Sequence, residues 1–504
     1  MTAPAERPVK RGKIKQIPVN REQLCWTALD LDDLIDDKHA ARAIWEMVSR
    51  VDVSKFEAEV ASWEGDVGRP CWSVRLLMSV VLYGYSMGVA SARELERLQE
   101  HEPGLRWLCG DKIINHHTIS NFRVRHEEAL VNLFAQILGV LSKEGMVDLG
   151  TVMVDGTKVE AVAGKGSYRR RETLEKHIEQ SREALNELRS QSEQEREQQD
   201  NRRRAAQQRA ARERVERMEA ALEALKKLEE EAAKSKREKL RVSETEAEAR
   251  KMKFDNGGWD LAYNVQVSTE ASHRVVVAVD VTSEANDTGQ LEGAVEAVRT
   301  NCGALPAQVV ADNGYATRDN VEKMEKAGVE LIAPWKEDES REAGACKSNG
   351  IELEFGGSKF AAHPDGDGLQ CKAGKKLVQI CEKVHHGQTR VIYEAAEQDC
   401  AQCEWLVQCC GRRGARRRVE RVKESEAMQK YLRRMAEPAT HELYKRRKEV
   451  AEFPHLWNKA VLGLRRFMVR GSAKTKMEAT WIAISYNISQ WMRVCRGVRT
   501  PALA

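Results

Sequence analysis

The sequence predicts a mixed α/β protein with a helical N-terminal region and two insertions, and three observations predict it. Residues 23–145 carry apolar side chains at helical spacing. From residue 151 the spacing changes to the alternation of a strand, as in "TVMVDGTKVEAVA". Residues 169–250 contain no Gly and no Pro, which indicates a separate helical segment inside the α/β part.

The N-terminal region contains helices with recognisable caps. "ARAIWEMVSRV" and "VRLLMSVVLYGYSMGV" are two of them, and Ser91 with Glu94 three residues later is typical of a capping box. A further helix is expected to start near Thr118 or Ser120, with polar and basic residues in its first turns. This pair of helices fits a helix-turn-helix-like DNA-binding domain. An ordinary helical bundle is the alternative, and composition alone favours it.

The α/β part resumes after residue 250. "WDLAYNVQVSTE", "HRVVVAVDVTS", "AQVVADNGY" and "VELIAPW" are expected strands, and helical patterns lie in "DTGQLEGAVEAVRTNCG" and "TRDNVEKMEKAG". Together with the first strand, the order β-β-β-α-β-α-β describes a mixed sheet.

The helical segment 169–250 has two apolar stripes separated by the polar stretch "SQSEQEREQQDNRRR". The stripes consist of Leu174, Ile178, Leu185 and Leu188, and of Met218, Leu222, Leu225 and Leu228. We expect an antiparallel helical hairpin or coiled-coil arm. Its charges are expected to be a solvated face first, and a DNA or partner surface second.

The second insertion, residues 338–425, holds seven of the 12 cysteines. Cys371, Cys400, Cys403 and Cys409 have a spacing that can close a tetrahedral zinc site. A set of unrelated buried thiols is the alternative. The run "GRRGARRRVERVK" follows, with Arg412, Arg413, Arg416, Arg417 and Arg418, and it predicts a phosphate-binding stripe or a merely soluble segment.

Two carboxylates occupy equivalent places in the expected sheet. Asp155 and Asp312 both end an apolar strand and precede a turn, and neighbouring strands would bring them together. Glu452 begins a helix after the last strand, and Lys459 lies two turns further along the same face. Hard oxygen ligands of this kind suit Mg²⁺. Taken singly, an Asp before Gly is more often a turn residue.

The composition limits the cellular setting. Net charge is only +4, so nucleic-acid binding would rest on local basic clusters. The first twenty residues lack the apolar core of a signal peptide, and "LLMSVVLYGYSMGVA" is too short to span a bilayer. A cytosolic protein is therefore expected, with its cysteines as thiols or metal ligands.

The sequence resembles the DDE transposases of bacterial insertion sequences over nearly the whole chain. "VDGTKVEA" resembles the block with the first catalytic Asp, and "ADNGYAT" resembles the block with the second. "YKRRKEVAEFPHLWNK", then "GLRRFMVRG" and "YNIS", resembles the block with the catalytic Glu. Residues 68–123 resemble the N-terminal DNA-binding domain, and the cysteine segment resembles an insertion found in one branch of the family.

The resemblance implies an α/β RNase H-like catalytic core, with a mixed sheet in the order β-β-β-α-β-α-β-α. The implied parts are a basic tail at 1–22, an all-α domain at 23–147, the core at 148–168 and 251–337, a coiled-coil insertion at 169–250, a cysteine-rich insertion at 338–425 and a helical end of the core at 426–504.

The resemblance also assigns roles. Asp155, Asp312 and Glu452 are implied to be the catalytic acids, holding Mg²⁺ or Mn²⁺, with Zn²⁺ in the cysteine segment. Tyr444, Arg447 and Lys459 match positions that hold transposon-end DNA in the family. Two features depart from the family: five positions separate Arg447 from Glu452, and "FPHLW" replaces the usual Phe-Gly. Glu449 is the alternative third acid.

The implied activity is binding of terminal inverted repeats, cleavage with water as nucleophile, and joining of a 3′-hydroxyl to target DNA. Double-stranded DNA is the implied partner, a homo-oligomer on paired ends the implied assembly, and the bacterial cytoplasm at the nucleoid the implied location, away from membranes. The alternatives are a derivative that binds DNA without cutting it and an RNase H-like nuclease without strand transfer.

Overall fold

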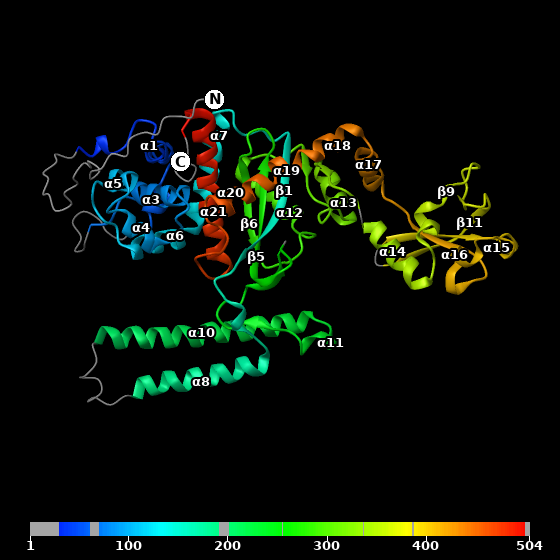
Figure 1. The fold of residues 1–504 in the computed structure, drawn as a ribbon, viewed down its shortest axis with the longest axis horizontal. Helices are drawn as coiled ribbons and strands as arrows, with labels where there is room; N and C mark the ends of the chain where they lie inside the picture. The colour runs from blue at the N-terminus through cyan, green and yellow to red at the C-terminus, as the bar shows by residue number, and fades with distance from the viewer. Residues whose placement is uncertain are drawn as a thin grey trace, which may run out of the picture.

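The computed structural model describes residues 30–60, 70–190, 201–254, 256–335, 337–385 and 388–498. The expected basic tail at 1–22 and the polar stretch at 191–200 lie outside these residues. A helical region, a central sheet and a small lobe follow one another along the long axis, and a helical arm projects to one side (Figure 1). The helical N-terminal region and the mixed sheet agree with the predicted fold class.

The central sheet has six strands in mixed orientation. They are β1 (Thr151–Glu160), β4 (Arg250–Lys253), β5 (Trp259–Glu270), β6 (Val276–Thr282), β7 (Gln308–Val310) and β8 (Glu330–Ile332). β5 pairs antiparallel with β1, β4 and β6, while β7 pairs parallel with β1 and β8. The helices α12 (Leu291–Cys302) and α13 (Arg318–Ala327) connect β6 to β7 and β7 to β8. All predicted core elements are present in the predicted order.

Strand β1 is the centre of this sheet, and its alternating side chains divide between two faces. Val152 and Val154 belong to the main hydrophobic core, whereas Met153 packs in a smaller cluster with Val310 and Val450. Asp155 follows on the Met153 side, because side chains two residues apart in a strand share a face. The ladder between β1 and β7 ends at the pair Met153 and Val310, two residues before both aspartates.

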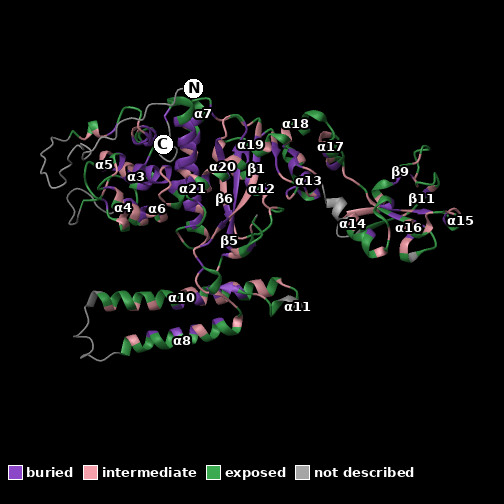
Figure 2. Cartoon of the chain, in the orientation of Figure 1, coloured by how far each residue is buried: buried purple, intermediate pink, exposed green. Residues whose placement is uncertain are grey.

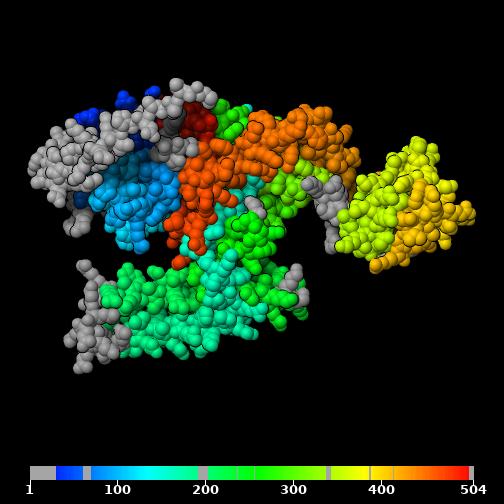
Figure 3. Space-filling view, viewed as in Figure 1, coloured from blue at the N-terminus to red at the C-terminus, as the bar shows by residue number. Residues whose placement is uncertain are grey.

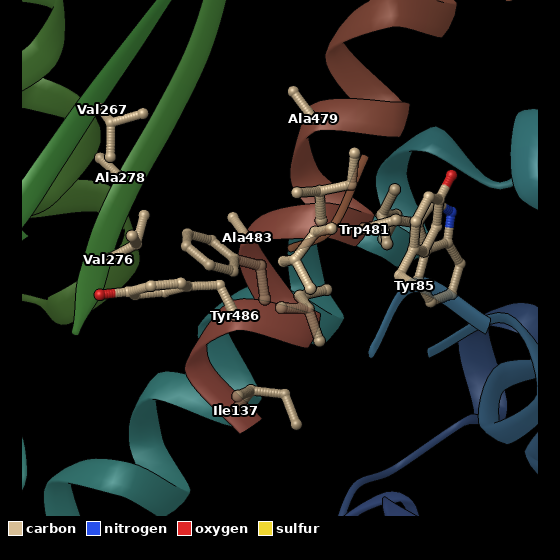
Figure 4. Close-up of a cluster of buried hydrophobic side chains, with 14 of the residues drawn as sticks. Tyr85, Ile137, Val267, Val276, Ala278, Ala479, Trp481, Ala483 and Tyr486 are labelled. Carbon is tan, nitrogen blue, oxygen red and sulfur yellow. The ribbon is translucent and has the colours of Figure 1, made fainter. Parts of the chain in front are cut away.

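Helix α21 (Ser472–Trp491) joins the sheet to the N-terminal helices, and it is buried around its whole circumference over most of its length. Figure 4 shows Tyr486 and Ala483 facing Val276 and Ala278 of the sheet, while Trp481 lies beside Tyr85 of the helical region. Its "YNIS" motif supplies a specific bond: Asn487 accepts from the Val276 N–H and donates to the Val276 carbonyl, each at 2.8 Å. The sheet and the N-terminal helices therefore share one hydrophobic core.

The N-terminal region is helical, as predicted. Its helices are α1 (Ala40–Ser49), α2 (Ser54–Glu57), α3 (Val74–Ser86), α4 (Ala92–Leu98), α5 (Pro103–Cys109), α6 (His116–Arg125) and α7 (Glu127–Lys143). The cap at Ser91 is confirmed, since its side chain accepts from the Glu94 N–H. The predicted start near Thr118 or Ser120 is wrong: Asn115 caps α6 by accepting from the His117 N–H. The helical conformation is interrupted at His126, which separates α6 from α7.

The expected hairpin arm is present as two packed helices, α8 (Arg171–Ser190) and α10 (Asn201–Glu231). Leu174 and Ile178 of α8 pack against Met218 and Leu225 of α10 in a separate hydrophobic cluster. Arg171 pairs with Glu229, and Arg182 with Glu219, which makes the two helices antiparallel. At the base, β2 (Tyr168–Arg169) pairs with β3 (Val242–Ser243), and α11 (Lys234–Arg237) lies beside them.

The cysteine segment forms a lobe with its own five-stranded sheet, set apart from the rest in the space-filling view (Figure 3). Its elements are α14 (Glu337–Asn349), β9 (Ala361–Ala362), β10 (Leu369–Gln370), β11 (Lys376–His385), β12 (Gln388–Ala395), α15 (Glu397–Ala401), α16 (Leu406–Cys410) and β13 (Arg418–Val422). The chain then returns to the core through α17 (Glu426–Met435), α18 (Pro438–Lys445), α19 (Arg447–Val450) and α20 (Glu452–Ala460).

Burial follows this organisation. The central sheet and α21 are largely buried, whereas the arm exposes most of its surface (Figure 2). Within the described ranges, no helix is both long and apolar enough to cross a membrane.

Candidate active site

Asp155 and Arg447 form the centre of the candidate site. Arg447 begins the short helix α19, and its Nη2 donates a hydrogen bond of 2.8 Å to Oδ1 of Asp155 on β1. The exposed fractions of the two side chains are only 13% and 15%. An ion pair removed from water in this way is costly unless both charges are satisfied. The pairing therefore indicates that the local fold holds these two groups together.

Helix α20 lies along β1 with its side chains in step with the strand. His455 Nε2 lies 3.7 Å from Oδ2 of Asp155, and Lys459 Nζ donates a hydrogen bond of 2.5 Å to Oγ1 of Thr157. Four residues of helix rise about 6 Å, and two residues of strand about 6.6 Å. The spacing of His455 and Lys459 thus matches that of Asp155 and Thr157. Lys459 lies on the helix face that the sequence predicted.

Asp312 lies in the connection between β7 and α13, beyond the last ladder pair. Its Oδ1 accepts a hydrogen bond of 2.6 Å from the Gly314 N–H, which is the geometry of an Asx turn. Asp312 is also close enough to Asp155 for its charge to act on that carboxyl. The turn interpretation of this acid is confirmed, and its role as a metal ligand stays a prediction.

The pKa of Asp155 reports the crowding of charge. The pKa of the Asp155 carboxyl is raised to about 6, chiefly by burial; Arg447 lowers it, and the nearby charges of Asp312 and Asp287 contribute to the increase. Burial lowers the pKa of His455 to about 4, so that imidazole is neutral at neutral pH. The His455 ring is 7% exposed and its Nε2 has no hydrogen-bond partner in the structure. The positive charge that faces Asp155 therefore comes from Arg447 and not from His455.

Glu452 is the first residue of α20, as predicted, and Pro454 lies in the first turn of that helix. Oε1 of Glu452 lies 3.7 Å from Nη1 of Arg447, so Arg447 bridges Glu452 and Asp155. The Glu452 side chain is 51% exposed, so it is free to turn toward a ligand. Glu449 lies on α19, a separate helix, and it is exposed. Tyr444 at the end of α18 is half-buried, and burial raises its pKa.

A network of hydrogen bonds between polar side chains near the aspartates was not predicted from the sequence. Tyr315, three residues after Asp312, donates its hydroxyl hydrogen bond to Oε1 of Gln266 on β5. Nε2 of Gln266 and Nδ2 of Asn264 each donate to Oδ1 of Asp287 at 2.7 Å. The alternating polar residues in "YNVQ", inside an otherwise apolar strand, are the signal that could have revealed it.

The four predicted zinc ligands lie near one another in the cysteine lobe. Burial raises the pKa of the Cys409 thiol to about 11, and the charges of Cys400, Cys371 and Cys403 raise it too. The Lys375 N–H donates to the sulfur of Cys371 at 3.3 Å, and the Arg417 N–H to that of Cys400 at 3.4 Å. Neighbouring Cys410 is buried.

The structure brings metal-binding residue types together without arranging them as a finished cage. Across the described residues, no group of three or more His, Cys, Asp and Glu side chains is placed to hold a metal ion. The thiol charges nevertheless act on one another, as do those of the aspartates.

The predicted basic stripe divides into exposed and buried arginines. Arg416 and Arg418 both pair with Glu394, at 2.6 Å, and keep about half of their surface in solvent, at 47% and 57%. Arg412 is exposed, and the side chain of Arg413 lies outside the described residues. Arg417 is only 7% exposed and donates to the Phe355 carbonyl, so it is a structural residue of the lobe rather than a phosphate contact.

Comparisons with known proteins point to one kind of enzyme. A transposase domain family (DUF772) matches residues 29–125, which include helices α1 to α6. A transposase DDE domain family matches residues 370–492, which include Glu452, Lys459 and α21. Asp155 and Asp312 lie between the two matched ranges. The search of curated proteins returned no match.

Proposed function

We propose that the chain, which two transposase family models match at residues 29–125 and 370–492, is a DDE transposase of an insertion sequence. In this proposal it binds the terminal inverted repeats of its element, cleaves the DNA there and joins the 3′-hydroxyl end to target DNA. The observation that carries this proposal is the convergence of Asp155, Asp312 and Glu452 around Arg447, from β1, the β7–α13 connection and α20. The strand order β4-β5-β1-β7-β8, with β6 also paired to β5, supports an RNase H-like core.

The donor set fits a divalent cation. Carboxylate oxygens are the ligands that Mg²⁺ and Mn²⁺ take in such sites. The charge of Asp312 raises the pKa of Asp155, after burial, so the two groups repel one another in the absence of a cation. Asp155 and Asp312 would hold Mg²⁺ or Mn²⁺ together, and Glu452 would complete the site. Such an ion supplies activation of the attacking oxygen and charge stabilisation at the leaving oxygen of a phosphodiester.

The basic side chains around the acids have a role in placing the scissile phosphate. Arg447 neutralises Asp155 in the free protein, and a planar guanidinium is also well suited to a phosphate. Lys459 is anchored on Thr157 at the same face and presents a second cation. We propose that both contact the transposon end, with Tyr444 beside them, and that they stabilise the charge that develops on the non-bridging oxygens.

Glu452 is the third acid in this proposal, and Glu449 is the alternative. Arg447 links Glu452 to Asp155, and α20 directs Glu452, His455 and Lys459 toward β1. Glu449 belongs to the preceding helix α19 and is exposed. The geometry therefore supports Glu452.

Further DNA contacts are proposed on two surfaces. The N-terminal helical region would bind the inverted repeat; α5 lies between α4 and α6, so a simple two-helix motif is not its form. Arg412, Arg413, Arg416 and Arg418 of the lobe would contact DNA backbone. We further propose that two or more copies act on paired ends, at the nucleoid in the bacterial cytoplasm. The arm is proposed as a coiled coil.

The cysteine lobe is proposed to hold one structural zinc ion through Cys371, Cys400, Cys403 and Cys409. Cys371, Cys400 and Cys403 each raise the pKa of Cys409, which supports this set because groups must be close to one another to have such an effect. Backbone N–H donors to the Cys371 and Cys400 sulfurs support it too, because such bonds stabilise thiolates. An ion there would join the strand β10, α15 and α16, which otherwise share only a small core.

A strand-transfer assay separates the three candidate functions. The protein would be incubated with Mg²⁺, labelled DNA carrying the inverted repeats that flank its gene, and a supercoiled target plasmid. Cleaved and joined products are expected. Cleavage without joining would favour a nuclease, and specific binding without cleavage would favour a derivative that has lost catalysis.

A further inference from the structure

We propose that Tyr315, Gln266 and Asp287 form a hydrogen-bonded latch that sets the spacing of the two catalytic aspartates. Tyr315 and Gln266 are its positioning residues, because neither is expected to touch DNA or metal. The inference rests on the proposed function, in which Asp155 and Asp312 hold one cation between them, and it names what holds those acids at the required separation.

The backbone ladder alone does not set this spacing. The parallel pairing of β1 with β7 ends at Met153 and Val310, before either acid. Beyond it, the Ala311 N–H donates to the Ile332 carbonyl at 3.0 Å. The next backbone bonds of the loop are internal to it, from the Tyr315 N–H to the Asp312 carbonyl and from Ala316 to Asn313. Asp312 therefore depends on side chains for its position relative to β1.

Tyr315 supplies the attachment. Its ring is completely buried, and its hydroxyl donates to Oε1 of Gln266. Gln266 on β5 lies directly opposite Gly156, the residue after Asp155. A single side chain thus connects the loop of Asp312 to the strand pair that carries Asp155.

Asp287 fixes the direction of the Gln266 amide. The side-chain amide of Gln266 has one acceptor oxygen and one donor nitrogen. A carboxylate accepts hydrogen bonds and does not donate them. Nε2 of Gln266 donates to Asp287 Oδ1 at 2.7 Å, so Oε1 must face the Tyr315 hydroxyl. Asn264 donates to the same Asp287 oxygen at 2.7 Å, and Lys158 Nζ lies 3.7 Å from it. These groups hold Asp287 in place.

Gly156 leaves the room that the latch occupies. A Cβ at this position would lie 2.5 Å from Asp287 Oδ1 and 2.5 Å from Gln266 Nε2. Both distances are far below van der Waals contact, so any side chain would displace the Gln266 amide or the Asp287 carboxylate. A glycine directly after the catalytic aspartate is therefore required by the latch.

Tyr315→Phe tests the proposal, because it deletes one hydroxyl and keeps the ring. Tyr263→Phe is the matched control. Tyr263 lies on β5 next to Asn264 and is also fully buried, but its hydroxyl donates a hydrogen bond of 3.0 Å to Glu246 instead. Mn²⁺ binding to DNA-free protein would be measured by calorimetry, with Asp312→Asn as the reference for loss of the site. Hydrogen exchange of residues 312–316 and cleavage of end DNA would be measured on the same samples.

Tyr315→Phe is expected to bind Mn²⁺ about tenfold more weakly and to show faster hydrogen exchange at residues 312–316. Its kcat should fall about a hundredfold with the KM for DNA unchanged, since a displacement of about 1 Å in a catalytic group has an effect of this size on rate. Tyr263→Phe should resemble the wild type in all three. Wild-type Mn²⁺ affinity in Tyr315→Phe, or equal losses in both Phe variants, would overturn the latch. If Asp312→Asn binds Mn²⁺ as the wild type does, the metal site of the proposed function fails, and the latch fails with it as a device for spacing metal ligands.

Discussion

Arg447 donates a 2.8 Å hydrogen bond to Asp155, although 292 positions separate the two residues in the chain. The contact spans the whole distance from the first strand of the sheet to the helices that follow the cysteine lobe. It explains how two segments with insertions between them make one site, since α19 and α20 are fixed against β1 by this pair and by the bond from Lys459 to Thr157.

The raised pKa of Asp155 predicts a pH-dependent effect of Asp155→Asn on stability. Burial raises the pKa of the folded protein's Asp155 to about 6, from an ordinary value of 3.8. The stabilisation by the protonated form is complete below pH 4 and is lost as pH rises through 6. Asn resembles the protonated acid, so Asp155→Asn should raise the free energy of unfolding of metal-free protein by about 2–3 kcal/mol at pH 8.

The same substitution should change stability little at pH 3, because that pH lies below the ordinary pKa of 3.8 and Asp155 is then mostly protonated in both the folded and the unfolded chain. Denaturant unfolding of both proteins with a chelator, at the two pH values, measures the difference. A stabilisation equal at both pH values would show that the charge of Asp155 is not its cause.

Glu452→Gln and Glu449→Gln should differ strongly in cleavage. Glu452 is joined to Asp155 through Arg447, whereas Glu449 is on another helix. We expect Glu452→Gln to lose about a thousandfold in rate, as expected when a group that stabilises the transition state is removed, and Glu449→Gln about twofold. Both rates would be measured on one DNA end after binding has been shown to be intact. The opposite ranking would assign the third acid to Glu449.

The purified protein should contain about one zinc per chain, because a four-thiolate site binds zinc tightly near neutral pH. Cys400→Ser and Cys403→Ser should lose the metal and expose the lobe to proteolysis, with the central sheet unchanged. Cys381→Ser on β11 is the control and should keep the zinc. Elemental analysis of protein prepared without chelators measures the zinc content. If the wild type contains no zinc, the proposed zinc site is wrong.

Lys459→Met should weaken binding to DNA of any sequence and should reduce the slope of log affinity against log salt by about 1, as expected for one phosphate contact. Lys445→Met is the control, because Lys445 is exposed and pairs with Glu442 at 2.7 Å. Binding isotherms over a range of salt concentrations measure the slopes. An unchanged slope for Lys459→Met would place Lys459 outside the DNA interface.

Much of the sheet was predictable because its strands are apolar runs. Asp312 follows the end of β7, as predicted, but the prediction that Asp155 ends a strand is wrong: β1 continues to Glu160 and stays paired with β5 beyond Asp155. Helix starts were less predictable: Asn115 rather than Thr118 or Ser120 caps α6, since any of the three residues could accept the hydrogen bond. The sequence did not predict that the sheet and the N-terminal helices share one hydrophobic core through α21. A helix that is apolar on all sides has no periodicity that would indicate which elements pack against it.

Asp155, Asp312 and Glu452 stay predictions as the acids of the site. Arg447 and Lys459 were named from the sequence, but other neighbours of the acids were not. His455 looks like an ordinary helix residue in the sequence, and only the position of α20 along β1 brings it to Asp155. The partnership of Gln266 with Tyr315 was not predicted for the same reason, since it depends on how the connection after β7 lies against β5. Arg417 was expected on a basic surface, but its place directly before β13 turns it into the lobe.

The most direct test of the account is cleavage of transposon-end DNA in Mg²⁺ by the wild type, Asp155→Asn and Asp312→Asn, with end binding measured in parallel. Asn preserves the shape of each side chain and removes the charge that would hold the cation. The account predicts that both variants bind the ends as the wild type does and show no detectable cleavage. Cleavage by either variant at close to the wild-type rate would contradict the assignment of the active site.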